Sequence, residues 1–106
     1  MIPTYISANI AVARTRNARK SDMYQAEHIL FPQLMASVMG NIDEACKEGR
    51  GECNWHIYSW LLEGFNNDIC KAGISLAEEK IEALGFRLVH KDENCYHIIW
   101  LSEGEE

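Results

Sequence analysis

The sequence has few of the residues that mark specialised protein classes. Only two prolines and four cysteines occur in 106 residues, and Cys46, Cys53, Cys70 and Cys95 are widely spaced. This spread is unlike the disulfide framework of a small secreted domain, so we expect reduced thiols. No apolar run reaches the roughly 18 residues needed to span a bilayer, and the first residues lack the features of a secretory signal. The sequence therefore predicts a cytoplasmic protein.

What is present is the composition of an ordinary globular domain. Hydrophobic residues make up 47% of the chain and charged residues 25%, which excludes the disordered, collagen-like and membrane classes. A chain of this length fits one domain, which buries about two thirds of the surface that its unfolded form exposes. Such a domain needs no metal or disulfide for folding, and we expect no cofactor.

Basic side chains are scarce and unevenly distributed. The net charge of −6 disfavours general nucleic-acid binding, because that affinity depends on neutralisation of phosphates by Lys and Arg. Residues 1–20 nevertheless hold four of the ten basic side chains and no acidic one, so the other 86 residues carry 6 basic and 16 acidic side chains. The four are Arg14, Arg16, Arg19 and Lys20. We expect a basic N-terminal arm or helix over residues 1–22, a compact domain over 23–101 and an acidic tail over 102–106.

Two helices are predicted in the first half of the chain. Ser7 can cap the first, whose apolar face consists mostly of alanines and would bury little area. The second starts at Ser21 or Asp22 and ends at Gly49, and Pro32 marks either a kink or a second start. Its apolar positions recur at three- and four-residue steps, at Phe31, Leu34, Met35, Val38, Ile42 and Ala45.

One helix and three strands are predicted in the second half. Residues 53–61 alternate like a strand, and residues 86–90 and 95–101 predict a hairpin with a four-residue polar link. Between them, a helix that ends at Gly85 should place these residues inward: Ile69, Ile74, Ala77, Ile81 and Leu84. The order helix, helix, strand, helix, strand, strand predicts an α+β domain, with two to three helices packed on a three-stranded, mainly antiparallel sheet. The first strand can lie beside either member of the hairpin.

Residues with catalytic or metal-binding chemistry are present without the required spacing. The cysteines and four histidines could supply zinc ligands, but no CxxC or HxxxH pair occurs. No cysteine lies in a glycine-rich elbow after a strand, and no phosphate-binding loop motif is present. Adjacent carboxylates such as Asp43 and Glu44 fall on polar helix faces, where neither is desolvated enough for acid–base work. The sequence therefore predicts neither an enzyme nor a metal site.

Two groups of residues are candidates for binding a partner. The basic run is either the solvated face of a helix or an arm that docks on an acidic surface, such as that of a neighbouring subunit. Among the aromatic residues, Trp55 and Trp100 are expected in the core, whereas Trp60 and Phe65 flank a loop and are expected to be exposed anchors. The candidate partner-binding residues are Arg14, Arg16, Arg19, Lys20, Trp60 and Phe65.

From residue 41 onward the sequence runs I-D-E-A-C-K-E-G, a strand, I-E-A-L-G-F-R-L-V and finally Y-H-I-I-W. This layout resembles a group of small, largely uncharacterised phage- and prophage-encoded α+β proteins, and residues 7–14 resemble their opening helix. The matching residues are Ile42, Ala45, Gly49, Leu84, Gly85, Phe86, Tyr96, Ile98 and Trp100. The resemblance implies a phage origin. Ile99 stands where a small polar residue is more usual, which implies a surface that a partner covers.

Three functional hypotheses remain open. The first is a non-enzymatic phage-encoded protein acting through protein–protein contacts, a virion structural or assembly component that forms homo-oligomers in the host cytoplasm or the virion. The second is a small inhibitor of a host or anti-phage defence protein, whose acidic surface imitates nucleic acid. The third is a winged-helix-like DNA binder, which Glu78, Glu79 and Glu82 oppose because phosphates would repel them. We expect a protein partner, self or host, rather than nucleic acid or a membrane.

Overall fold

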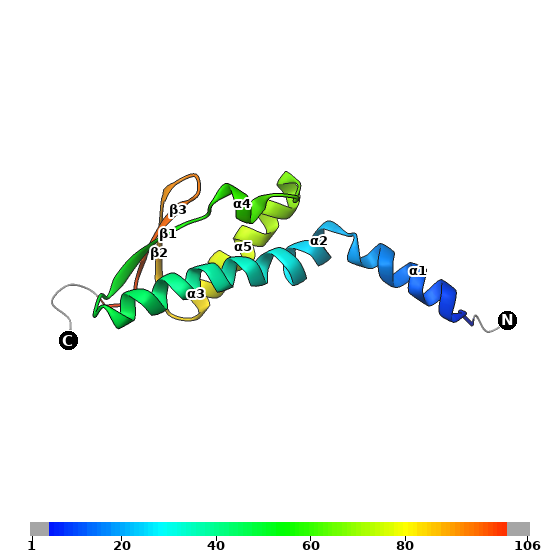
Figure 1. Ribbon diagram of the computed structural model, residues 1–106, viewed down its shortest axis with the longest axis horizontal. Coiled ribbons are helices and arrows are strands. Elements are labelled where there is room, and N and C mark those ends of the chain that lie inside the picture. The colour runs from blue at the N-terminus through cyan, green and yellow to red at the C-terminus, as the bar shows by residue number, and fades with distance from the viewer. Residues whose placement is uncertain (1–4, 102–106) are drawn as a thin grey trace.

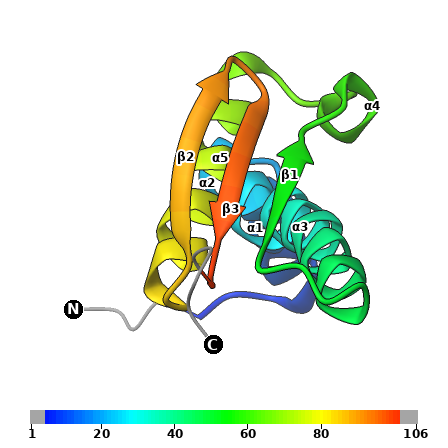
Figure 2. The same ribbon diagram turned by 90° about the vertical axis from the view of Figure 1, so that its left-hand side faces the viewer.

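The computed structural model describes residues 5–101. Its elements in chain order are α1 (Ala8–Arg19), α2 (Asp22–Gln25), the π-helical turn η1 (Ala26–Leu30), α3 (Phe31–Lys47), β1 (Glu52–His56), α4 (Ser59–Leu62), α5 (Asn67–Ala83), β2 (Arg87–Asp92) and β3 (Cys95–Ile99). Helices α3 and α5 cover one face of an antiparallel sheet with strand order β1-β3-β2 (Figures 1 and 2). The predicted α+β fold is confirmed. The tail predicted over 102–106 lies outside the described residues.

The core lies between these helices and the inner face of the sheet. Trp55 and Tyr96 face each other across β1 and β3, with ring centroids 5.5 Å apart, and both are almost fully buried. The Trp55 indole donates a hydrogen bond to Ser37 Oγ at 3.2 Å, and the Tyr96 hydroxyl donates one to Glu78 Oε1 at 2.8 Å. Each large aromatic ring therefore enters the core with its polar atom paired.

A single helical segment runs from α2 through η1 into α3. Pro32 has no N–H to donate, and in a regular α-helix its ring would clash with the carbonyl of residue 28. The wider π-helical turn of η1 lies directly before it and is a common device for absorbing such a disruption. The segment continues without a new start, and it buries Leu34, Val38, Ile42 and Ala45 as the periodicity predicts.

The predicted boundaries of the first strand were too long. Strand β1 ends at His56, and residues 59–62 form the short helix α4. Ile57 and Leu61 are buried as predicted, although Ile57 lies in the link after β1 and only Leu61 lies in α4. Strand β1 pairs with β3, the second strand of the hairpin, which is one of the two alternatives that the sequence left open.

The end of α5 and the hairpin also differ in detail. Gly85 has a φ of 99° and turns the chain after α5, so Leu84, which was expected to face inward, is 51% exposed. Strand β2 extends to Asp92, with a register shift between His90 and Asp92. The link between the strands is consequently the two-residue turn 93–94, shorter than the predicted four residues.

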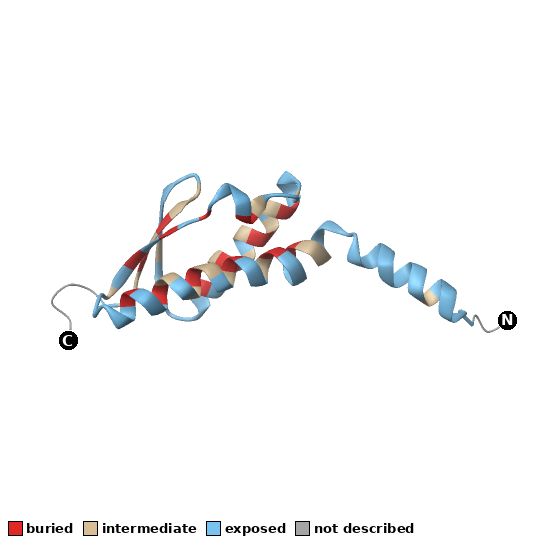
Figure 3. Cartoon of the chain, in the orientation of Figure 1, coloured by how far each residue is buried: buried red, intermediate tan, exposed pale blue. Residues whose placement is uncertain are grey.

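Helix α1 projects away from the rest of the molecule (Figure 1). Its N-terminus is capped by Ser7, whose Oγ accepts a hydrogen bond from Ile10 N at 3.3 Å, but none of its residues is buried (Figure 3). The radius of gyration is 18.7 Å and the longest extent 69 Å, against a radius of about 13 Å for a compact chain of this length. The arm is therefore held by its covalent link and little else.

Candidate functional site

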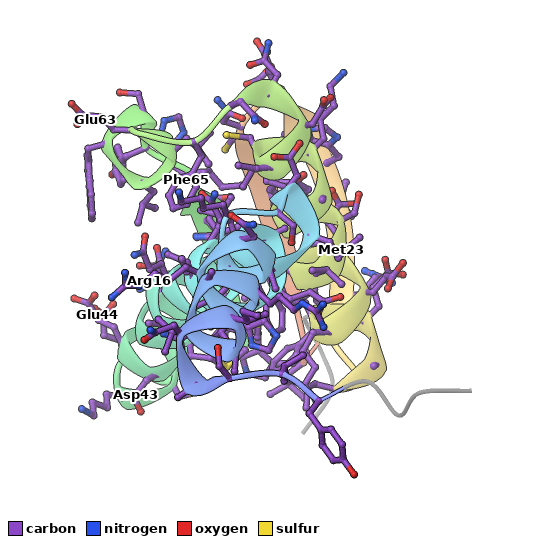
Figure 4. All side chains as sticks on the ribbon, turned by 90° about the vertical axis from the view of Figure 1, so that its right-hand side faces the viewer. Arg16, Met23, Asp43, Glu44, Glu63 and Phe65 are labelled. Carbon is purple, nitrogen blue, oxygen red and sulfur yellow. The ribbon has the colours of Figure 1, made fainter. Side chains whose placement is uncertain are left out.

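The first candidate surface lies within the basic arm predicted over residues 1–22. From here on, the arm means its described part that ends with the last basic side chain, Tyr5 to Lys20. Arg16, Arg19 and Lys20 follow at three- and four-residue steps and so share one side of α1. Arg16 and Arg19 lie in the last turn, where positive charge is favourable beside the helix C-terminus. Among residues 5–101, no basic side chain of the arm belongs to an ion pair. Figure 4 shows Arg16 directed outward.

Apolar side chains accompany these charges. Tyr5 is 85% exposed, and Ile6, Ile10 and Val12 are each nearly half exposed. The arm therefore presents both guanidinium groups and apolar area to solvent.

The second candidate surface is a row of three aromatic side chains, His56, Tyr58 and Trp60, which we call the aromatic ladder. The His56 and Tyr58 rings meet edge to face at 4.7 Å, and the Tyr58 and Trp60 rings stack at 6.3 Å with an interplanar angle of 12°. Ile57 and Leu61, which alternate with the ladder, are buried and anchor it to the core. Tyr58 is 54% and Trp60 66% exposed, so the rings are fixed in place yet face solvent.

Phe65 lies differently from Trp60, although both were expected to be exposed anchors. Gly64, with a φ of 87°, turns the chain back after α4, and Phe65 is half-buried against the core. It lines an open pocket of about 530 Å³ between α4, α5 and the hairpin turn, together with Leu62, Cys70 and Ile74. Figure 4 shows Glu63 directed outward and Phe65 toward the body. Trp100 is also only half-buried and meets Phe86 edge to face.

Titratable groups form no reactive cluster within residues 5–101. No three His, Cys, Asp or Glu residues in this part of the chain lie close enough to hold a metal ion. Burial raises the pKa of the Cys53 and Cys70 thiols, which keeps both protonated and weakly nucleophilic at neutral pH. His97 contacts only Glu52 among charged groups, at 3.3 Å. In the described part of the chain, no helix is long and apolar enough to cross a membrane.

The sequence interpretation missed His56 and Tyr58 as members of the second surface. Their signal was present, because His56, Tyr58 and Trp60 alternate with the buried Ile57 and with Leu61. A strand over these residues would also have placed all three on one face, but only Trp60, which flanks the loop, was considered as an exposed anchor. The structure does not bring the two surfaces together within one chain: the arm and the ladder lie on opposite sides of α2 along the long axis (Figure 1).

Comparison of the chain with protein-family models, with curated proteins and with solved structures finds no match.

Proposed function

We propose that this chain is a non-enzymatic protein that functions by binding other protein chains, in the first place further copies of itself, through its N-terminal arm. The observation that carries this proposal is that α1 buries none of its twelve residues. An isolated helix of that length is marginal in water even when rich in alanine. A partner surface supplies the packing energy that the chain's own body does not.

The charge distribution supports a partner that resembles the chain itself. The arm carries four basic side chains and no acidic one, whereas the 86 residues after it carry 16 acidic side chains. Opposite charges on two parts of one sequence favour association between copies, because the arm of one attracts the body of the next. The resemblance of the sequence to phage-encoded proteins supports the further proposal that the assembly serves as a virion or assembly component.

The test is sedimentation velocity of the wild type at low and high salt. Contacts between charged surfaces are screened with a Debye length of about 8 Å at physiological ionic strength, so assembly should weaken as salt rises. Replacing the four basic arm residues by Ser should abolish assembly and leave the circular dichroism of the body intact. The matched control replaces four exposed basic residues of the body by Ser, namely Lys71, Lys80, Arg87 and Lys91.

Two outcomes would contradict this proposal. Normal assembly of the arm variant would show that the arm is merely solvated. A wild type that stays monomeric at every salt concentration, and that binds only a protein from host lysate, would favour the inhibitor hypothesis instead.

A further inference from the structure

We infer that the aromatic ladder, together with Glu63, is the surface that receives the arm of a second copy. This inference rests on the proposed function, since it names the acceptor for the arm. It assigns a role to Tyr58 and Trp60, the largest exposed aromatic side chains of the body. Neither is part of the buried core, and neither lines a described pocket.

The ladder has the properties of a binding surface before any partner is considered. Tryptophan is highly buried on average, so a Trp that is 66% exposed is informative. Trp60 is also held in place, because it stacks on Tyr58 and neighbours the buried Leu61. Ordered aromatic rings lose little conformational entropy when a partner covers them, which is why Trp and Tyr are enriched among the residues that dominate binding energy.

The arm matches this surface in chemistry and in spacing. Arg side chains stack on the faces of Trp and Tyr rings and pair with carboxylates in a bidentate way. Tyr58 and Trp60 already stack on each other. The 66% exposed Trp60 ring therefore offers its outer face to one guanidinium, that of Arg16 or Arg19. Residues three or four apart on a helix are separated by about 4.5–6 Å along its axis, so the next basic side chain of the arm can reach the carboxylate beside that ring. Glu63, directed outward just after α4, supplies the carboxylate (Figure 4).

The occupant has to come from another chain. Along the long axis, α2 lies between α4 and α1, and α1 runs away from the ladder (Figure 1). Each copy thus carries one donor surface, the arm, and one acceptor surface, the ladder. Such a pair of unlike surfaces joins copies head to tail, or closes when two copies exchange arms reciprocally.

A complementation experiment tests this arrangement. One variant lacks the donor (Arg14, Arg16, Arg19 and Lys20 changed to Ser), and the other lacks the acceptor (Tyr58→Ala with Trp60→Ala). Each variant alone should self-associate about tenfold or more weakly than the wild type, so it should be monomeric at concentrations where the wild type assembles. An equimolar mixture should form a one-to-one heterodimer through the single intact interface. The control is Leu84→Ala with Val89→Ala, which removes comparably exposed apolar side chains elsewhere and should assemble as the wild type does.

A second variant guards against a folding defect. Glu63→Arg leaves every ring in place and reverses one exposed charge, and it should also weaken assembly. If the wild type assembles and both the ladder variant and Glu63→Arg assemble equally strongly, the ladder is not the acceptor. The proposed self-association would still stand in that case. Absence of assembly in the wild type would overturn both.

Discussion

At the scale of single residues, Tyr96 is the polar group whose position matters most to the core. It is 2% exposed, its ring lies against Trp55 and stacks on His90 at 4.6 Å, and its hydroxyl donates to Glu78. Burial, followed by the hydrogen bond to Glu78 and the charge of that carboxylate, raises the pKa of the hydroxyl above its ordinary value of 10.0. The folded protein therefore holds this proton more tightly than the unfolded chain does.

That difference predicts a loss of stability at alkaline pH. The stabilising contribution is fully present below about pH 10, where the unfolded Tyr is also protonated, and is lost as the pH rises through the raised folded value. Tyr96→Phe should cost about 1 kcal/mol at neutral pH by removing the hydrogen bond, and should lose less additional stability at high pH. Urea unfolding of both proteins across this range measures the difference, with Tyr24→Phe, which lies outside both candidate surfaces, as control. Parallel curves for wild type and Tyr96→Phe would show that the hydroxyl is not linked to folding.

At the scale of elements, two glycines in long helices have opposite surroundings. A Cβ added to Gly73 of α5 would lie 2.7 Å from Leu30 Cδ2 and 2.9 Å from its Cγ, whereas a Cβ on Gly40 of α3 would have no atom within 4 Å. Gly73→Ala should destabilise the protein by about 1–3 kcal/mol through overpacking against η1. Gly40→Ala should stabilise it by about 0.5–1 kcal/mol through helix propensity. Thermal and urea unfolding measure both, and equal effects would contradict the close approach of α5 to η1.

The helices and strands could be predicted from the sequence where a local pattern of apolar residues determines them, and could not where tertiary contacts do. The long helices were predictable because Leu34, Val38 and Ile42 repeat with the helical period. The end of β1 was not, because Ile57 and Leu61 are four residues apart and satisfy a strand and a helical turn equally well.

The same distinction between local pattern and tertiary contact applies to the two candidate surfaces. The charge of the arm was visible in the sequence, and so was the exposure expected of Trp60. The burial of Phe65 was not, because it depends on the positive φ of Gly64, which turns the chain back toward the core after α4. The direction of α1 had no signal either, since a helix without buried residues carries no apolar face that ties it to one neighbour.

At the scale of the whole molecule, α1 lengthens the molecule because it projects away from the body (Figure 1). Because α1 buries no residue, removing residues 2–20 should leave the melting temperature of the body unchanged. The radius of gyration of the monomer should fall from near 18.7 Å to about 12 Å, the value for a compact chain of the remaining length. Small-angle X-ray scattering of the full and the truncated chain at high salt, where the proposed assembly should dissociate, measures both radii.

The scattering result also separates an extended arm from one folded back on its own body. A full-length monomer with a radius near 13 Å, as a compact chain of this size has, would mean that α1 packs on its own chain. In that case the truncated protein should also melt at a lower temperature, because packing area would have been lost. An unchanged melting temperature together with the large drop in radius is the combination that leaves the arm available, in each monomer, for the ladder of another copy.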